Sequence, residues 1–396
     1  MRIAILGSVA LAVPPPAQGG TELIAYYQAV GLSEKGHKVL LIAASGTKDQ
    51  FKKWGGENEN LEIIEVGGGN TVDGSNKEFK FDPLMMEASR KLRMEMAALA
   101  QVQKVLTERK DDYDIILNNM RGEAVFLELA KILNKPFVNV CHLNLFPELV
   151  TLFKEYNTHV ITISNAQRKD FPHLNYLATV YNCVDTNKYS FSPSDNGYLL
   201  MVGTIGRHKN QKAAIEVAKR LKMDLVLAGK IRDQDYFEEI KKDIDGVHFQ
   251  WGGELGFKEK LKLYQGAKAF IFPILWEEPF GLVMIEAMAC GVPVIAYNNG
   301  AVPEVVADGE TGFIIRSEDK ISNSKFHPST FLGAGISNEI QNQNFNIQKA
   351  EIDGLVAAVR RVGEIDRKAC RKWVEEKFTV EKMVERYELA LLTVGV

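Results

Sequence analysis

Two glutamates, Glu278 and Glu286, lie in the stretch of this sequence whose residue types best suit ligand binding. The stretch, Trp276 to Pro293, follows an apolar run at residues 270–272, and its pattern predicts a turn that opens a helix. Backbone amides at such a turn lack partners and carry the positive end of the helix dipole, so they can receive a phosphate or sugar hydroxyls. Gly281 would let that ligand approach the backbone closely.

Glu286 could hold a vicinal diol such as a ribose, because carboxylate oxygens accept several hydrogen bonds. The alternative is an ordinary exposed glutamate on a helix. Its neighbours Ile285, Met288 and Ala289 predict a mostly buried face, where a charge needs partners. The carboxylate pair by itself does not indicate a metal site.

Cations and glycines follow two other predicted strands. Arg207 and Lys209 come after the apolar run 198–202 and could bind a diphosphate through charge-assisted hydrogen bonds, although Arg207 could equally be a plain loop residue. Gly19 and Gly20 follow the first apolar run, where they could bring backbone amides close to a phosphate. Alone they are weak evidence, because glycine pairs usually mark only turns.

His142 directly follows the apolar run 137–140, which places it at a carboxyl-terminal strand edge, where open α/β sheets bind ligands. A lone histidine is more often structural, and His37 is interpreted in that way. Four polar residues at the same predicted edge suit a hydroxylated acceptor, with a solvated loop as the alternative: Asn118, Asn119, Arg121 and Asn144.

Short continuous apolar runs between helical patterns predict the strands that position these residues. Six such runs precede residue 164 and six more lie between residues 198 and 315, so we expect an α/β protein with two Rossmann-like parallel-sheet domains. The predicted parts are 1–190, 191–370 with a polar insertion at 317–348, and C-terminal helices at 371–396 that pack back toward the first domain.

The composition of the chain limits the classes of partner that we expect it to bind. The chain has 48 basic and 51 acidic residues, a net charge of −3, so no basic excess draws it to nucleic acid or an anionic membrane. Its four cysteines are widely spaced and favour neither a disulfide framework nor a zinc site, which makes a cytoplasmic setting the default. We expect no transmembrane segment. The methionines and cations of 85–96 suit peripheral membrane contact, although packing against the core is favoured.

The segment from Glu278 to Ala296 resembles the retaining nucleotide-sugar glycosyltransferases of family 4, and the resemblance extends over nearly the whole chain. It implies the GT-B fold, with two Rossmann-like domains facing a central cleft, the nucleotide on the C-terminal domain and the acceptor on the N-terminal one. It also implies that Glu278 lies by the donor sugar and that Glu286 holds the ribose. Backbone groups of three residues would meet the sugar or diphosphate: Phe280, Gly281 and Leu282.

The resemblance extends to the other loops with one departure. Lys209 matches a lysine that binds the diphosphate, whereas Thr204 stands where the family has an arginine. Arg207, three residues later, could fill that gap. Gly19 and Gly20 match a glycine loop that approaches the donor phosphate.

The resemblance implies a hexosyltransferase of the EC 2.4.1 type, in which the acceptor attacks on the face from which the diphosphate leaves. His142 would position the donor sugar, and Lys209 with the helix amides would stabilise the leaving group. We expect UDP-glucose as the donor, with a GDP-mannose-dependent mannosyltransferase as the alternative. The acceptor and the oligomeric state stay open. The nucleotide sugar is a co-substrate, and no cofactor or metal is expected.

Three other classes of protein fit the sequence less well. A catalytically degenerate nucleotide-sugar-binding protein is favoured only by Thr204. A nicotinamide oxidoreductase is disfavoured because no G-x-G-x-x-G follows Gly7, and a sugar-nucleotide epimerase would consume the donor without an acceptor. The base could be contacted by the loop around Trp251, whose ring would either stack on it or pack internally.

Overall fold

The protein consists of two compact units. The computed structural model describes four segments of the chain: 1–17, 19–69, 87–316 and 338–394. One unit holds Met1–Cys183 together with Phe378–Val396, and the other holds Val184–Lys377. The second unit extends beyond both predicted boundaries, near residues 190 and 371, because it begins at Val184 and includes the helix that ends at Lys377.

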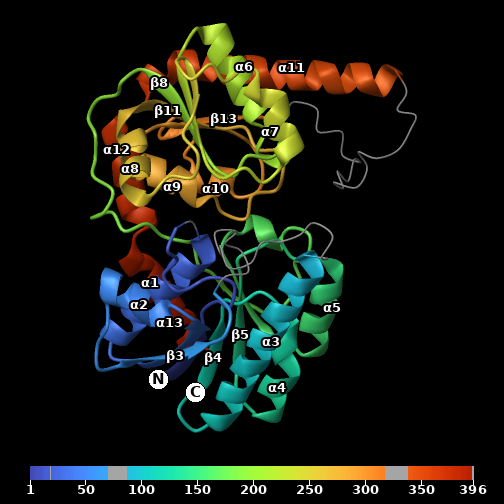
Figure 1. The fold of residues 1–396 in the computed structure, drawn as a ribbon, viewed down its shortest axis with the longest axis vertical. Helices are drawn as coiled ribbons and strands as arrows, with labels where there is room; N and C mark the ends of the chain where they lie inside the picture. Colours follow the sequence, from blue (N-terminus) through green and yellow to red (C-terminus); the bar gives the residue numbers. More distant parts are fainter. Residues whose placement is uncertain (18, 70–86, 317–337, 395–396) are drawn as a thin grey trace. The chain divides into compact units, whose positions relative to one another are not determined.

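The first unit is built on a seven-stranded parallel sheet in the order β3-β2-β1-β4-β5-β6-β7. Its strands are β1 (Arg2–Leu6), β2 (Lys38–Ala44), β3 (Leu61–Val66), β4 (Ile115–Asn118), β5 (Phe137–Cys141), β6 (His159–Thr162) and β7 (Tyr176–Thr179). Its α-helices are α1 (Gly20–Glu34), α2 (Thr47–Trp54), α3 (Glu87–Glu108), α4 (Leu127–Ile132), α5 (Pro147–Glu155) and α13 (Val380–Leu392). Helices α3, α4 and α5 cover one face of the sheet, and α1, α2 and α13 lie on the other (Figure 1).

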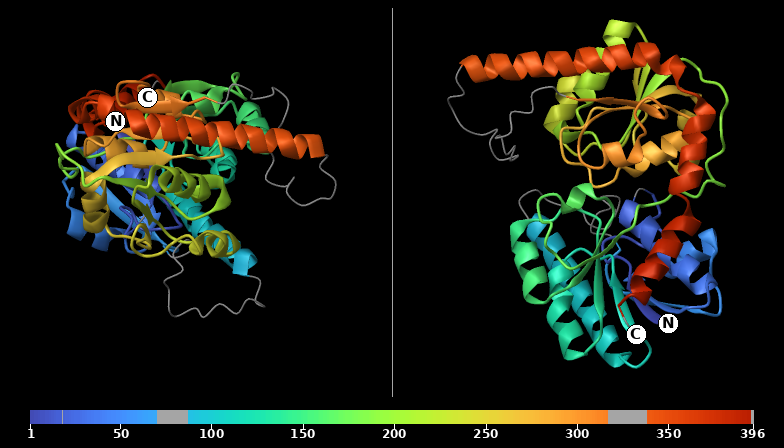
Figure 2. Two further views of the ribbon diagram at one scale, coloured as in Figure 1. Left: turned by 90° about the horizontal axis from the view of Figure 1, so that it is seen from above. Right: turned by 180° about the vertical axis from the view of Figure 1, so that it is seen from behind.

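The second unit is built on a six-stranded parallel sheet in the order β10-β9-β8-β11-β12-β13. Its strands are β8 (Tyr198–Val202), β9 (Leu225–Ala228), β10 (Phe249–Trp251), β11 (Ala267–Phe272), β12 (Val294–Tyr297) and β13 (Gly312–Ile315). Its α-helices are α6 (Gln211–Leu221), α7 (Gln234–Lys241), α8 (Phe257–Gly266), α9 (Leu282–Ala289), α10 (Val302–Val305), α11 (Asn338–Arg361) and α12 (Arg367–Lys377). Figure 2 shows α11 and α12 following one another along this unit.

The parallel sheets are buried on both faces, which explains the continuous apolar runs in the sequence. In β1, for example, Ile3 to Leu6 are fully buried. The helix α13 packs on α1 so closely that a Cβ on Gly31 would lie 2.3 Å from Val384 Cγ2. The last helix is therefore part of the first unit's own packing.

The twelve predicted strands are present, and the predicted two-sheet α/β fold is confirmed. Strand β7 was not predicted because it is a half-buried edge strand without a continuous apolar run. Of the predicted polar insertion, residues 317–337 lie outside the described residues, and residues from Asn338 onward form the start of α11 instead of a loop. Helix α11 is anchored further along by the buried Leu355 and Val359, and packing of this kind outweighs local propensity.

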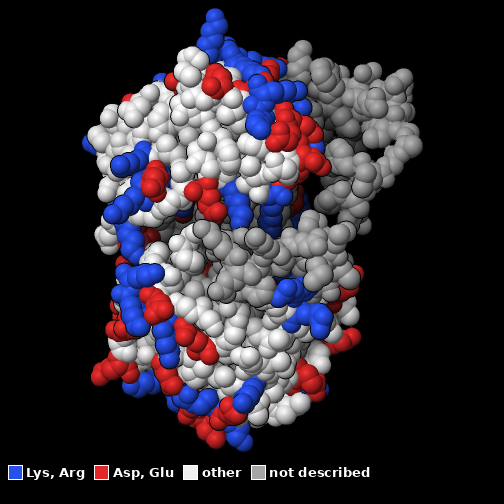
Figure 3. Space-filling view, viewed as in Figure 1, with Lys and Arg blue, Asp and Glu red and all other residues white. Residues whose placement is uncertain are grey.

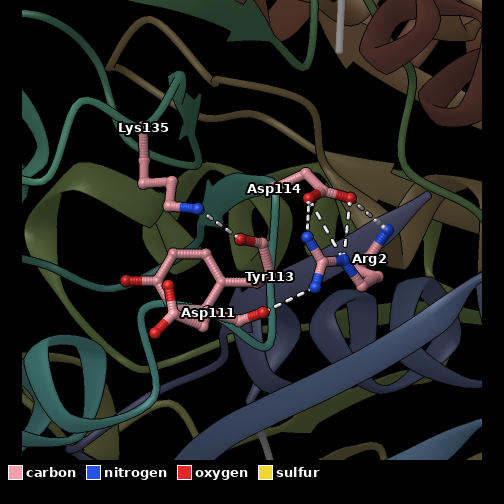
Figure 4. A network of polar contacts seen from close by, with 5 residues as sticks. All are labelled: Arg2, Asp111, Tyr113, Asp114 and Lys135. Atoms are coloured by element: carbon pink, nitrogen blue, oxygen red, sulfur yellow. Dashed lines mark hydrogen bonds and ion pairs between the residues drawn. The ribbon is translucent and has the colours of Figure 1, made fainter.

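Charges of both signs are interspersed over the described part of the face shown in Figure 3. One charged group lies at the amino ends of β1 and β4, where Arg2 pairs with Asp114 and donates to the carbonyl of Asp111 (Figure 4). Beside it, Lys135 Nζ donates to the carbonyl of Tyr113 at 2.8 Å. No helix among the described residues is long and apolar enough to cross a bilayer.

Candidate functional site

The loops after β8 and β11 carry three charged residues that the sequence analysis singled out: Arg207, Lys209 and Glu278. The two strands are neighbours in the sheet, so the loops that follow them start side by side at its carboxyl edge, the edge where open α/β sheets bind ligands. The β8 loop leads through a short 3-10 turn at Arg207–Lys209 into α6. The β11 loop leads through Trp276 and Glu278 into α9.

Lys209 and Glu278 form a largely buried ion pair between these loops. Lys209 Nζ lies 3.0 Å from Glu278 Oε2, and the two side chains are 15% and 11% exposed. Trp276 Nε1 donates to the same oxygen at 2.9 Å, and its ring lies 4.9 Å from the lysine nitrogen. The charge-assisted bonds fix the carboxylate and the ammonium together, so the structure brings these two candidate residues into contact.

The backbone around Glu278 is equally constrained. A Cβ on Gly300, whose φ is +56°, would lie 2.3 Å from the nitrogen and oxygen of Glu278, so only glycine fits there. The amide of Ala301 donates to the carbonyl of Glu278 at 2.8 Å. The position of the carboxylate is therefore set by backbone as well as by side-chain contacts.

Helix α9 begins at this edge with Gly281 as its N-cap, in the left-handed region at φ +89°. No described side chain caps the helix, and the Met284 amide donates to the Gly281 carbonyl at 2.9 Å. The amides before it, including that of Leu282, precede the first intrahelical bonds and can serve a ligand. Phe280 is 1% exposed, and its ring belongs to the core.

Glu286, in α9, is 7% exposed and accepts three hydrogen bonds. Tyr189 and Lys260 donate to Oε1 at 2.9 and 3.1 Å, and Tyr264 donates to Oε2 at 2.7 Å. Burial, and then the charge of Glu286, raise the pKa of Tyr264 well above its usual value, so this tyrosine stays protonated. The prediction of a buried and partnered carboxylate is confirmed, and lone pairs remain on it for a ligand hydroxyl.

The remaining candidate residues of the β8 loop, Thr204 and Arg207, have other partners in the structure. Thr204 contributes its carbonyl to a 3.0 Å hydrogen bond from Gln211. Arg207 pairs with Glu239, lies 3.6 Å from Asp233, and is 57% exposed. To fill the gap at Thr204, the Arg207 side chain would have to leave both carboxylates, so the structure does not place it there.

In the first unit, Gly19 is the N-cap of α1 and Gly20 is the first residue of that helix. A Cβ on Gly19 would lie 2.8 Å from Pro15 Cβ and 2.7 Å from Glu22 Oε2, which explains the need for glycine. Glu22 is 5% exposed and accepts from Ser8 Oγ at 2.8 Å. The predicted glycine loop is therefore packed tightly against Pro15 and Glu22.

His142 follows β5 and ends a chain of side-chain hydrogen bonds. Asn119 Nδ2 donates to Gln28 Oε1 at 2.7 Å, and Asn119 Oδ1 lies 2.8 Å from His142 Nε2. Because the amide oxygen can only accept, His142 carries its proton on Nε2 and presents the lone pair of Nδ1. Burial lowers the pKa of His142 to about 4, with a further contribution from Arg121, so the ring is neutral at pH 7.

The four predicted acceptor residues separate into two groups. Asn118 and Asn119 are 0% and 3% exposed, and the Asn118 amide donates to Asn139 Oδ1 at 2.9 Å. A direct contact between these two amides and an acceptor would require internal hydrogen bonds to break. Arg121 and Asn144 lie exposed on the loops after β4 and β5.

Several residues of the site were not predicted, because their signals are weak in sequence. Gln28 lies on a buried helix face, Tyr189 precedes β8, and Trp276 was noted only as the start of a motif. Lys260 and Tyr264 are four residues apart on α8, which places them on one helix face, but nothing in their spacing points to Glu286. Trp251 donates to the Gly229 carbonyl at 3.0 Å and its ring packs 4.7 Å from that of Phe237, so its indole is used internally.

The two parallel sheets define the GT-B class of fold, and comparisons with known proteins agree. The Anabaena protein Alr3699/HepE in complex with UDP and glucose matches 98% of this chain and 99% of its own, with a TM-score of 0.65 and 20% identity. The model for glycosyl transferases group 1 matches residues 186–325 of this chain.

Curated relatives match over different lengths. Alpha-maltose-1-phosphate synthase of Mycobacterium tuberculosis is 30% identical over 39% of this chain and 48% of its own length. Phosphatidyl-myo-inositol mannosyltransferase of Mycolicibacterium smegmatis is 24% identical over 81% of this chain and 82% of its own. The match therefore spans about half the length of the first of these relatives.

Proposed function

We propose that this protein is a retaining glycosyltransferase that moves a hexosyl group from a nucleotide sugar to a hydroxyl group. The observation that carries the proposal is the Lys209–Glu278 pair beside the uncapped start of α9, within the segment that matches the family model. A cation and free amides suit a diphosphate, and a fixed carboxylate suits a sugar hydroxyl.

UDP-glucose is the donor that we propose first. The structurally similar Anabaena protein was solved with UDP-glucose and with UDP and glucose, which supports but does not decide this choice. GDP-mannose is the second candidate, because the relative that aligns over most of this chain is named a mannosyltransferase.

In the proposed reaction, the acceptor oxygen attacks the anomeric carbon on the face from which the diphosphate departs. The bond between that carbon and the diphosphate oxygen breaks, and the acceptor's proton passes to the leaving diphosphate. Lys209 and the α9 amides stabilise the growing charge on the diphosphate, and neutral His142 accepts a hydrogen bond from a sugar hydroxyl through Nδ1. This transfer is neither an oxidation nor a reduction, and it needs no reactant other than the donor and the acceptor.

The first experiment is a thermal-shift and hydrolysis screen of the purified protein with UDP-glucose, UDP-galactose, UDP-N-acetylglucosamine, GDP-mannose and ADP-glucose. A ligand that binds only the native state raises the melting temperature. We expect a shift with one donor and slow release of its nucleoside diphosphate. Binding without release in the presence of candidate acceptors would favour a degenerate binding protein, the alternative that Thr204 supports. No shift with any donor would contradict the proposal.

We also propose that the reaction needs no metal ion. The proposal rests on Lys209 and the α9 amides, which offer positive charge for the diphosphate. Donor hydrolysis should then continue in EDTA at the rate measured in buffer alone. Loss of hydrolysis in EDTA and its recovery with magnesium or manganese would overturn this part of the proposal.

A further inference from the structure

The β8 and β9 loops run side by side beyond the end of their strands. Ile205 and Ile231 form an isolated parallel bridge, with Ile205 donating to the Lys230 carbonyl at 2.9 Å and Arg232 donating to the Ile205 carbonyl at 3.0 Å. A Cβ on Gly229, whose φ is +148°, would lie 1.9 Å from the carbonyl oxygen of Gly203. The bridge and this close backbone contact fix the register of the two loops.

This register decides which side chains are neighbours. Successive side chains of extended backbone point to opposite faces. Ile205, 1% exposed, and the half-buried Ile231 share one face, so the other face carries Thr204 opposite Lys230. Arg232 lies one step further along on that same face. The position that lacks an arginine therefore has a lysine as its direct neighbour and an arginine next to that.

Both cations are exposed, and neither forms an ion pair with another residue that the structure describes. Arg207 differs, because Glu239 and Asp233 already hold it. The pKa of His208 is lowered by burial first, then by Lys209 and Arg232, which places the Arg232 charge near the ring. That ring lies 5.9 Å from the ring of Trp276, the partner of Glu278.

We propose that Lys230 and Arg232 supply the diphosphate contact that the missing arginine at Thr204 would make. The inference rests on the proposed function and extends it by naming residues of a different loop for the leaving group. A guanidinium binds phosphate oxygens with two parallel bonds, and an ammonium adds a point charge. Lys209 then acts from one side of Thr204 and the β9 loop from the other.

The test is titration calorimetry of the full chain with UDP, GDP and the matching monophosphates. The double variant Lys230→Ala/Arg232→Ala should weaken binding of the preferred nucleoside diphosphate roughly ten- to a hundredfold, as expected for lost hydrogen bonds between charged groups. Binding of the monophosphate should change less. Adding Thr204→Arg should restore much of the diphosphate affinity. Lys242→Ala, which removes an exposed cation after α7, serves as the control with unchanged affinity.

The outcomes separate this inference from the proposed function. Weaker diphosphate binding with an unchanged melting temperature supports the inference, and recovery through Thr204→Arg shows that the effect is local. Wild-type affinity in the double variant overturns the inference and leaves the proposed function standing. If the wild-type protein binds neither UDP nor GDP, both the function and the inference fail.

Discussion

The carboxyl edges of the two sheets are prepared for different partners. In the first unit, Gln28, Asn119 and His142 form a neutral chain of hydrogen bonds that ends in an imidazole acceptor. In the second, Lys209 and Glu278 present paired charges. Neutral groups with fixed directions discriminate hydroxyl groups by geometry, whereas charges bind a diphosphate and respond as its charge grows. The same type of sheet thus provides one edge with neutral hydrogen-bonding groups and one edge with charged groups.

Removing the charge from the second edge should give the largest effect. We expect Lys209→Ala to lower kcat about 10²- to 10³-fold, the range for losing one preorganised group that stabilises a developing charge. The lysine is placed to act mainly as the diphosphate departs, so KM for the donor should change less. Steady-state kinetics with the donor identified by the screen would measure both constants.

Lys242→Ala is the matched control for that variant, since it removes a cation that is exposed and remote in sequence from the β8 and β11 loops. Turnover equal to wild type in Lys209→Ala would remove the main support for charge stabilisation at the second edge. An equal loss in both variants would instead indicate a general effect of charge.

The tyrosines of the second unit allow a charged and a neutral acceptor to be compared. Tyr264→Phe removes a 2.7 Å bond to the buried carboxylate of Glu286, and we expect a loss of about 1.5–3 kcal/mol. Tyr198→Phe removes an equally short bond, 2.7 Å, to the Leu263 carbonyl and should cost about 0.5–1.5 kcal/mol. Thermal unfolding of both variants provides the comparison.

If Tyr198→Phe lowers the melting temperature as much as Tyr264→Phe, the carboxylate of Glu286 is not the stronger acceptor. It would then be less tightly held than its three donors indicate. A UDP titration of Tyr264→Phe adds a second readout, because a loosened Glu286 should also weaken binding of the ribose if it holds that group.

The neutral hydrogen-bond chain of the first unit can be disrupted by introducing a charge beside His142. In Asn119→Asp, a carboxylate beside His142 Nε2 should raise the pKa of the imidazole from its wild-type value of about 4. Below the new pKa the ring is protonated and loses its acceptor, so kcat/KM should fall about tenfold per pH unit. The wild-type ring stays neutral from pH 6 to 8, and His142 should contribute no slope there.

Asn119→Ala separates charge from position. It frees the ring without adding a carboxylate, so activity should drop while the dependence on pH stays that of wild type. A pH profile of Asn119→Asp that coincides with that of wild type would contradict a hydrogen-bond role for Nδ1.

The sequence was most informative where function and folding use the same local signal. The apolar runs predicted the strands, and the Glu278 to Glu286 motif predicted a turn followed by a helix, because both depend on residues close together in the chain. The partners of Glu286 and His142 come from other elements, as with Tyr264 and Gln28, and no periodicity encodes such contacts. The partner of Arg207 likewise comes from another element, since Glu239 lies in α7.

Substitution of Arg2, which pairs with Asp114, tests whether a charge affects activity only when it lies at the carboxyl edge of a sheet. They lie at the amino ends of β1 and β4, and their side chains are 48% and 23% exposed (Figure 4). Solvent screens such pairs, so we expect Arg2→Ala to change the melting temperature little at pH 7 and to leave activity unchanged. Activity loss comparable to that of Lys209→Ala would contradict the assignment of function to the carboxyl edges.

The pH dependence of this small effect has a definite sign. Hydrogen bonds from Arg2 lower the pKa of Asp114, so the pair stabilises the fold fully above the unfolded carboxyl pKa of about 4. The stabilisation is lost as the pH falls through the lower folded value. Melting curves of wild type and Arg2→Ala should therefore differ slightly at pH 7 and converge in acid. A difference that persists after Asp114 is protonated would mean that the bond from Arg2 to the Asp111 carbonyl, not the ion pair, stabilises this edge.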